Sequence, residues 1–184
     1  MADYELLGVA TASSSPTTLT VSSIPQTHDD LEIVCLLMGG AGNYGSEAKF
    51  RLNGITDNYY NRNWIRGLDG SVYHGANVTG DNGIAISQGI GAGDTGGNYN
   101  AAISVVYIPN YTLSSGASPD PGYMTGLVKS RQTYSFSKWE IGLYSWSMTN
   151  YGAAADPVTS FGVSGNALAD NSMIAVYGIN RSSS

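Results

Sequence analysis

Leu-Glu-Ile-Val-Cys-Leu-Leu-Met, residues 31 to 38, is the stretch that decides the fold. All but one of its residues are apolar, and the run is bounded by Asp30 and Gly39. A short, continuous apolar run between turn residues is typical of a strand that is covered on both faces. Ala101 to Pro109 (AAISVVYIP) has the same character. The two stretches predict central, fully buried strands of a sheet.

Shorter segments in which polar and apolar residues alternate fill most of the remaining chain. Polar turn residues such as Ser13-Ser-Ser-Pro16 separate them, and no window shows a helical period, a linker or a repeat. Gly67 to Asn100 is rich in glycine and contributes a single short candidate. The candidate strands are Tyr4–Ala12, Thr17–Ile24, Glu47–Asn53, Tyr59–Gly67, Ile84–Gln88, Tyr123–Ser130, Glu140–Ser147, Pro157–Ser164 and Ser172–Asn180.

This pattern predicts an all-β chain in which residues 1–184 form a single domain. Two antiparallel sheets packed face to face would accommodate the segments, so we expect a β-sandwich of about eight to ten strands. A jelly roll or a related Greek key is the expected topology.

Composition excludes several classes of protein. Only 12% of the 184 residues are charged, about half the usual share, which is too little to cover exposed helix faces. The net charge is −6 and the eight basic residues are not clustered, so the sequence predicts no binding to nucleic acid or to anionic membranes. The longest apolar run, Ile33 to Met38, is far shorter than the roughly 20 residues of a membrane helix.

The N-terminus and the single cysteine favour synthesis in a reducing cytoplasm. Met1 to Glu5 (MADYE) is acidic where a signal peptide would be basic, and no apolar segment follows. Cys35 lies inside the apolar run and has no partner for an internal disulfide. We expect a buried, inert thiol.

No motif points to catalysis. The two histidines, His28 and His74, lie apart in polar surroundings, and the adjacent acids Asp29 and Asp30 would point to opposite faces of an extended chain. Gly162 to Gly165 has the wrong spacing for a nucleophile elbow. The sequence therefore predicts a protein that is not an enzyme and has no catalytic residue, metal ligand or cofactor.

Aromatic residues in half-polar strands leave three interpretations open. In Glu140 to Ser147, Tyr144 and Trp146 share one face, whereas Ile141 and Leu143 share the other. The aromatic face could pack in the core, meet another subunit or stack against a sugar, because Tyr and Trp are enriched in all three settings.

Several stretches together resemble a family of small virion proteins of tailed bacteriophages, especially phages of cyanobacteria. The resemblance covers most of the chain and thins between Ser71 and Asn100 and between Ser114 and Ser137. It rests on YELLGVATASSS (Tyr4–Ser15), LTVSSIPQTHDDLEIV (Leu19–Val34), FRLNG (Phe50–Gly54), NYY (Asn58–Tyr60), YIPNYT (Tyr107–Thr112) and MIAVYGI (Met173–Ile179).

The resemblance implies a β-sandwich on the outside of a virion that is made in the bacterial cytoplasm. Within the family, a capsid decoration (cement) protein is expected, with the major capsid protein and copies of itself as partners, a trimer being favoured over a dimer. The residues expected at these interfaces are Tyr4, Leu6, Leu7, His28, Asp29, Tyr144 and Trp146. The alternative is a tail or head-fibre module that binds host-surface glycan through Trp64 and Tyr73.

Overall fold

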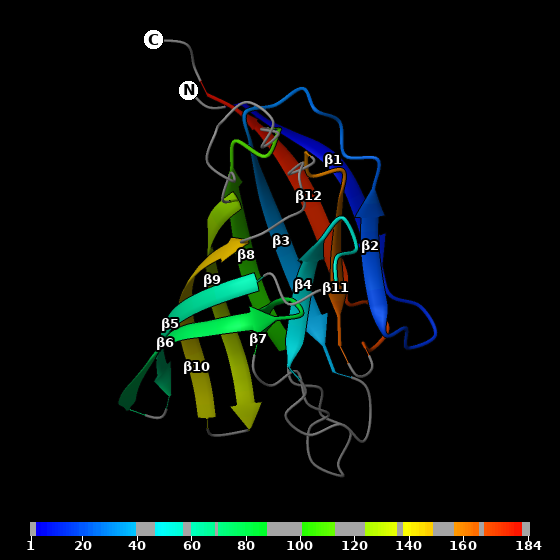
Figure 1. The fold of residues 1–184 in the computed structure, drawn as a ribbon. Helices are drawn as coiled ribbons and strands as arrows, with labels where there is room; N and C mark the ends of the chain where they lie inside the picture. Colours follow the sequence, from blue (N-terminus) through cyan, green and yellow to red (C-terminus); the bar gives the residue numbers. More distant parts are fainter. Residues whose placement is uncertain are drawn as a thin grey trace.

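Twelve strands and no helix make up the described part of the chain in the computed structural model (Figure 1). The structure describes residues 3–39, 47–56, 60–68, 70–87, 101–112, 124–135, 138–148, 157–165 and 168–181. The strands are β1 (Asp3–Thr11), β2 (Thr18–Ser22), β3 (Asp30–Met38), β4 (Ala48–Leu52), β5 (Tyr60–Leu68), β6 (Ser71–Asp81), β7 (Ile84–Ser87), β8 (Ala101–Pro109), β9 (Met124–Ser135), β10 (Lys138–Met148), β11 (Ser160–Ser164) and β12 (Met173–Asn180).

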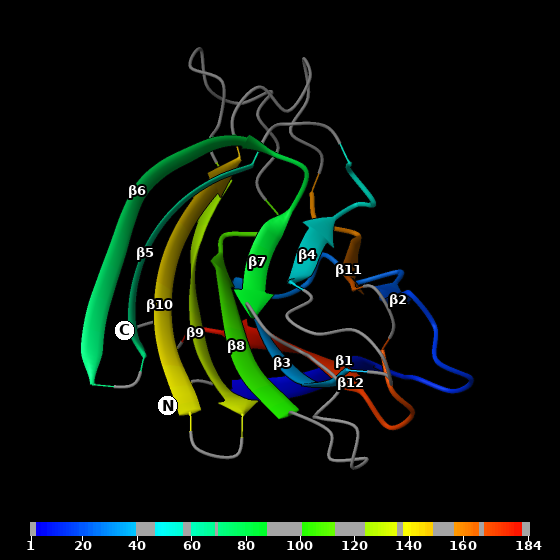
Figure 2. The same ribbon diagram turned by 90° about the horizontal axis from the view of Figure 1, so that it is seen from below.

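The strands form two antiparallel sheets, so the predicted β-sandwich is confirmed. The larger sheet has the order β1-β12-β3-β8-β9-β10-β5-β6, and the smaller sheet has the order β2-β11-β4-β7. The quartets β1-β12-β3-β8 and β2-β11-β4-β7 have the strand pairing of a jelly roll. The hairpins β5–β6 and β9–β10 are additions that pair with each other and extend the larger sheet. Figure 2 shows this extension curving past β7.

Twelve strands exceed the predicted eight to ten, and β6 is the strand that matches none of the candidate segments. The sequence Ser-Val-Tyr-His-Gly-Ala-Asn-Val-Thr-Gly-Asp of β6 carries two glycines and few large apolar residues, which weakens any strand signal. Its pairing with β5 is interrupted by two register shifts. Tertiary pairing with β5 at the sheet edge, not local propensity, makes this segment a strand.

β3 lies between β12 and β8 near the middle of the larger sheet. Its alternate residues Leu31, Ile33, Cys35 and Leu37 face the smaller sheet and are fully buried. The intervening residues Glu32 to Met38 on the other face are half-buried. The expectation that this strand would be buried on both faces is therefore wrong, because no part of the chain that the structure describes forms a second layer over the outer face of the larger sheet.

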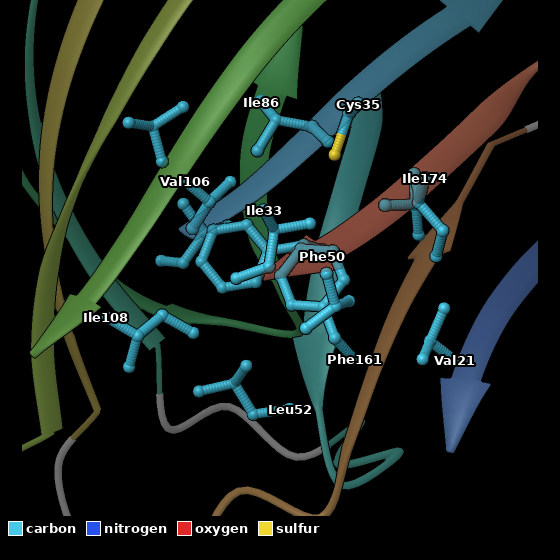
Figure 3. Packing of buried hydrophobic residues seen from close by; sticks show 14 of the residues in the cluster. Val21, Ile33, Cys35, Phe50, Leu52, Ile86, Val106, Ile108, Phe161 and Ile174 are labelled. Carbon is cyan, nitrogen blue, oxygen red and sulfur yellow. The ribbon is translucent and has the colours of Figure 1, made fainter. Parts of the chain in front are cut away.

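Aromatic and aliphatic side chains from both sheets meet in one core (Figure 3). Phe50 of β4 stacks on Phe161 of β11 with ring centroids 5.3 Å apart. Trp146 of β10 meets Phe50 edge-on at 5.2 Å. Because Trp146 belongs to an added hairpin, this contact joins the extension to the jelly-roll core, and such pairs contribute about 1 kcal/mol beyond their buried area.

Asn53 closes the end of β4 against the start of β11. It adopts φ = 51°, and Gly54 after it adopts φ = 70°, a region that Asn and Gly tolerate best. Asn53 Oδ1 accepts hydrogen bonds from the backbone N–H groups of Thr159 (2.8 Å) and Ser160 (3.0 Å). One side chain thus shapes the turn and aligns two strands.

Candidate interface

The outer face of the larger sheet carries most of the large apolar residues that the structure describes as exposed. The structure describes ten large apolar side chains as exposed, and the strand registers place all but Tyr73 on this face. The nine are Tyr4, Leu6, Val9, Ile65, Val72, Ile103, Leu127, Ile141 and Leu143, with exposed fractions from 45% to 75%. Scattered exposed apolar residues are ordinary, but a contiguous set marks a contact surface. We call this surface the outer face.

The added hairpins contribute the centre of this set. Leu143 of β10 is paired with Ile65 of β5, and Ile141 is paired with Gly67 on the same face. The outer face of the smaller sheet has a different chemistry, with hydroxyl-bearing and basic side chains that include Thr18, Thr20, Ser22, Lys49 and Arg51. Among the described residues, the exposed large apolar side chains other than Tyr73 therefore lie on one side of the sandwich.

Besides Asp30, which is buried and paired with Arg181, three charged residues of the described strands interrupt the outer face. Lys129 and Arg131 are exposed on β9, where their register neighbours are Leu143, Val105, Ile141 and Ile103. Glu32 lies two strands away on β3. Among the described residues, none of the three charges has an ion-pair partner. Unpaired cations within an apolar surface favour a partner that supplies acids.

Tyr144 and Trp146 are not at an interface, and the prediction that they meet another subunit is wrong. Tyr144 is fully buried and Trp146 is 3% exposed, because both point from β10 into the space between the layers. Ile141 (51% exposed) and Leu143 (47%) point outward instead. Alternation in the sequence separated the two faces correctly but could not tell which one is inside, since aromatic residues suit either.

β1 splits the predicted N-terminal contact residues between the two faces. A β-bulge between Leu6 and Gly8 shifts the register against β12. Tyr4 (58% exposed) and Leu6 (54%) lie on the outer face, whereas Leu7 is partly buried and packs against the core. Tyr4 and Leu6 are therefore available to a partner, and Leu7 serves the fold.

His28 and Asp29 have internal partners. His28 is 7% exposed, and its ring nitrogens lie 3.0 Å from Glu5 Oε2 and 3.1 Å from Thr27 Oγ1. The absence of a side chain at Gly178 leaves room for the imidazole ring, because a Cβ there would lie 2.5 Å from it. Asp29 is exposed and accepts the backbone N–H of Arg181 at 2.6 Å. The hydrogen bond between Asp29 and Arg181 connects the end of β12 to the loop that contains His28. Because His28 is buried, its side chain is not available to a partner.

Asp30 is the centre of a buried polar cluster beside this loop. It is 2% exposed and accepts hydrogen bonds from Tyr107 Oη (2.6 Å), the Asn110 backbone N–H (2.9 Å) and the guanidinium of Arg181 (Nε at 3.0 Å, with Nη2 as a second donor). Burial alone would raise the pKa of Asp30, but the hydrogen bonds from Arg181, Tyr107 and Asn110 outweigh it and lower that pKa below its ordinary value. Desolvation and the neighbouring carboxylate raise the pKa of Tyr107. No local sequence pattern indicates this cluster, because its members lie far apart in the chain.

Trp64 and Tyr73, the predicted glycan residues, flank Arg66 on the inner face of the extension. The Arg66 guanidinium carbon lies 4.8 Å from the Trp64 ring centroid and 5.5 Å from the Tyr73 ring centroid. Trp64 also packs on Gly75, where a Cβ would lie 2.5 Å from its indole. Tyr73 is 44% exposed and Trp64 is partly buried. Arg66 lies against both rings and Gly75 lies against Trp64, so the aromatic surface that is open to a sugar at this pair is mainly that of Tyr73.

A buried carboxylate, Glu140, lies behind this cluster and was not predicted. It is 1% exposed, with Oε2 3.5 Å from Arg66 Nη1 and Oε1 3.4 Å from Tyr144 Oη. Desolvation, followed by the Glu140 charge, raises the pKa of Tyr144 to about 12. Gln132, the register partner of Glu140, is 1% exposed and its two amide heteroatoms have no hydrogen-bond partner among the described residues. The extension therefore buries polar groups beside its buried aromatic residues.

A groove of about 470 Å³ lies at one end of the outer face, across β5, β10, β9 and β8. Its sheet-surface residues are mostly uncharged amides and hydroxyls. The lining residues are Asn61, Arg62, Asn63, Tyr107, Pro109, Thr125, Gly126, Leu127, Ser145, Trp146 and Ser147. Arg62 donates to Glu47 Oε1 at 2.8 Å. The groove offers hydrogen-bonding groups beside Tyr107 and Leu127, a chemistry suited to a neutral polar ligand.

The described residues show no group of three or more His, Cys, Asp and Glu side chains arranged to hold a metal ion. Cys35 is fully buried, and burial raises the pKa of its thiol. His74 is exposed on the edge strand β6, apart from His28. Within the ranges described, no helix has the length and apolar character needed to cross a membrane.

Comparisons with known proteins add little. No protein-family model and no curated protein matches the chain. A solved structure described as "Structure of infectious bursal disease virus Gx strain" aligns with 97% of this chain and 39% of its own chain, at 13% identity. Its TM-score of 0.12 is too low to carry an argument about fold or function.

Proposed function

We propose that this chain is a non-enzymatic structural protein of a bacteriophage virion, made in the bacterial cytoplasm and assembled on the outer surface of the head. In this role it decorates the shell and stabilises contacts between major capsid subunits. Its partners are the major capsid protein and copies of itself, and the outer face is its assembly surface.

The outer face carries the proposal. Nine half-exposed apolar residues on one side of a sandwich, against a polar opposite side, suit a protein that works by contact with other protein surfaces. The jelly roll is common to viral capsid and lectin domains, which is compatible with the resemblance to phage virion proteins but does not by itself assign a function.

The added hairpins support the same proposal. The eight strands of a jelly roll already form a closed core, yet this chain inserts β5–β6 and β9–β10 and places Ile65, Leu127, Ile141 and Leu143 on their outer side. Fully burying one such side chain contributes about 1.5–3 kcal/mol. Because each is about half exposed, covering it contributes roughly half that amount.

The groove favours a second candidate function, a fibre or tail module that binds neutral glycan. Asn61, Asn63, Thr125, Ser145 and Ser147 line it with amide and hydroxyl groups, the groups that recognise sugar hydroxyls through hydrogen bonds. This moves the candidate glycan site from Trp64 and Tyr73 to the other side of the sheet.

The number of copies per particle separates the two functions. Quantitative mass spectrometry of purified virions, calibrated against the major capsid protein, should find this chain in hundreds of copies if it decorates the head. A dozen copies or fewer would favour the fibre or tail module. Absence from the particle would refute both.

The Leu143→Asp variant tests the surface itself. It should lower occupancy on the particle, because it places a charge in the apolar surface. Thr20→Asp, on the polar outer side of the smaller sheet, is the matched control and should leave occupancy unchanged. Equal occupancy of the two variants would contradict the assignment of the outer face.

A further inference from the structure

We propose that Asn82 is a site of self-modification: it loses its side-chain amide by cyclising onto Gly83, and two cations of β4 promote the reaction. The cations are Lys49 and Arg51, on the polar outer side of the smaller sheet. The proposal does not depend on the role of the outer face, and it holds for either of the two proposed functions.

An asparagine that is followed by glycine can close a five-membered ring, because glycine has no side chain to obstruct the approach. The Gly83 backbone nitrogen loses its proton to solvent and attacks Asn82 Cγ, which forms a new C–N bond. The Cγ–Nδ2 bond then breaks, and the amide takes up a proton and leaves as ammonia. Water opens the resulting succinimide at one of its two carbonyls, which gives aspartate or isoaspartate at position 82. The reaction consumes one water and releases one ammonia, with no oxidation or reduction.

The turn that carries this pair lies directly on β4. Asn82 is exposed and Gly83 is buried. A Cβ on Gly83 would lie 2.9 Å from the Phe50 carbonyl oxygen, so this close approach to the strand requires glycine. The same Cβ would lie 3.2 Å from Lys49 Cβ and 3.4 Å from Arg51 Cγ. The packing that requires glycine therefore also places the reactive peptide beside both cations.

Lys49 is placed to stabilise the charge that forms on the asparagine side chain. Its Nζ donates to Asn82 Oδ1 at 3.2 Å. Negative charge develops on this oxygen when the ring closes, and a cation that is already hydrogen-bonded to it lowers the barrier as a donor in an oxyanion hole does. Glu47 Oε2 lies 3.5 Å from the same Nζ, but the other Glu47 oxygen accepts from Arg62 at 2.8 Å. The carboxylate therefore divides its charge between two cations.

Arg51 acts on the attacking nitrogen. Its Nε donates to the backbone carbonyl oxygen of Asn82 at 2.8 Å. That oxygen and the Gly83 nitrogen belong to one peptide unit, so resonance spreads the charge of the deprotonated nitrogen onto the oxygen. The guanidinium, which stays charged at working pH, therefore favours the deprotonated nitrogen that attacks. One cation thus serves the carbon that is attacked, and the other serves the nucleophile.

Asn53-Gly54, the other Asn-Gly pair in the chain, is an internal comparison because its asparagine is fixed. Asn53 Oδ1 accepts the backbone N–H groups of Thr159 (2.8 Å) and Ser160 (3.0 Å). Asn53 Nδ2 donates to the Pro157 carbonyl oxygen at 3.0 Å. Rotation of the side chain toward the Gly54 nitrogen would break all three bonds. The fold therefore protects this pair and presents the other one in an exposed turn.

The product changes the connection between the two sheets. Asn82 and Gly83 join β6 of the larger sheet to β7 of the smaller sheet. A carboxylate at position 82 forms an ion pair with Lys49, and isoaspartate adds one carbon to the backbone of this short connection. A chain that has reacted carries one negative charge beyond the −6 of the unmodified chain, so isoelectric focusing separates the two forms.

Peptide mapping by mass spectrometry of the full, folded chain during incubation in neutral buffer tests the proposal. We expect Asn82 to convert to a mixture of aspartate and isoaspartate, whereas Asn53 keeps its amide. The same chain in guanidinium chloride gives the rate of each pair without the fold. Folding should slow the reaction of Asn53 by about tenfold or more and should not slow the reaction of Asn82.

Substitution of the two cations tests their roles. Lys49→Met and Arg51→Met should each slow the reaction of Asn82 by about tenfold, less than the loss of a buried oxyanion donor because solvent screens this turn. Lys49→Arg keeps a cation and should restore most of the rate. Lys129→Met, on the opposite side of the sandwich, is the matched control and should leave the rate unchanged. A substitution that only loosened the turn would speed the reaction, so the direction of the change separates the two effects.

Three results would overturn the proposal. The first is a folded chain in which Asn82 keeps its amide for as long as the denatured chain takes to lose it. The second is a folded chain in which Asn53 reacts as fast as Asn82. The third is an unchanged rate at Asn82 in either Lys49→Met or Arg51→Met. The copy number on the particle, which decides the proposed function, is measured independently of all three.

Discussion

Replacing Asp30 with Asn tests the polar cluster that joins the end of β12 to the loop before β3. The natural carboxylate is 2% exposed and accepts hydrogen bonds from Tyr107, Asn110 and Arg181. Asn keeps one acceptor oxygen, loses the charge and turns an amide donor toward existing donors. The bonds from Tyr107 and Asn110 contribute most, because Arg181 is about half exposed and its share is screened by solvent. At about 1–2 kcal/mol for each of the two, Asp30→Asn should lower the free energy of unfolding by about 2–4 kcal/mol at pH 7.

The pH dependence of this difference gives the sharper assay. Because hydrogen bonds lower the pKa of Asp30 in the folded state, its contribution is complete above the unfolded pKa of about 3.9 and is lost as the pH falls through the folded pKa. Urea unfolding of both proteins between pH 7 and pH 2 should therefore show the difference shrinking below about pH 4. A difference that is constant with pH, or below 1 kcal/mol at pH 7, would refute the reasoning. Asp29→Asn, at the exposed neighbouring residue, is the control and should lower the free energy of unfolding by less.

Three further predictions concern the fold. Asn53→Ala should lower the free energy of unfolding by about 1–3 kcal/mol in urea titration, because two backbone donors at the start of β11 lose their acceptor. Asn53→Asp keeps that acceptor and should lower the free energy of unfolding by less. Gly126→Ala should lower the thermal midpoint in calorimetry by several degrees, because the added Cβ would lie 2.2 Å from the Tyr107 carbonyl oxygen. Gly67→Ala is the control and should change the midpoint little, because the space around its added Cβ is open. The Cys35 thiol, fully buried with a raised pKa, should react with a thiol reagent only as fast as the chain unfolds; rapid labelling of the folded protein would contradict its placement.

The sequence predicted the architecture well because the jelly-roll strands carry strong local signals. The sequences of β3 and β8 are apolar runs, and the turn residues that flank them predicted the strand ends to within a residue or two. β6 was missed because an edge strand with Gly, His and Asn has little propensity of its own and is held by pairing with β5. The local sequence of β6 does not show that β5 will pair with it.

The candidate site was predicted only in part, for a different physical reason. Tyr4 and Leu6 are exposed on the outer face as an interface requires, whereas Tyr144 and Trp146 are buried. Period-2 alternation assigns residues to two faces but does not say which face a second sheet will cover. The aromatic residues of β10 suggested contact with a partner, yet the aliphatic residues between them are the ones left exposed.

The reactivity of single introduced thiols tests the central claim, that the outer face is the contact surface, most directly. Cys35 is buried, so Leu143→Cys and Thr20→Cys each add one accessible thiol with little background. In purified particles that carry the variants, the account predicts that the thiol of Leu143→Cys is protected by at least tenfold relative to the isolated, dilute protein. The thiol of Thr20→Cys should remain as reactive as in the isolated protein. Equal reactivity of the two thiols in the particle would contradict the account.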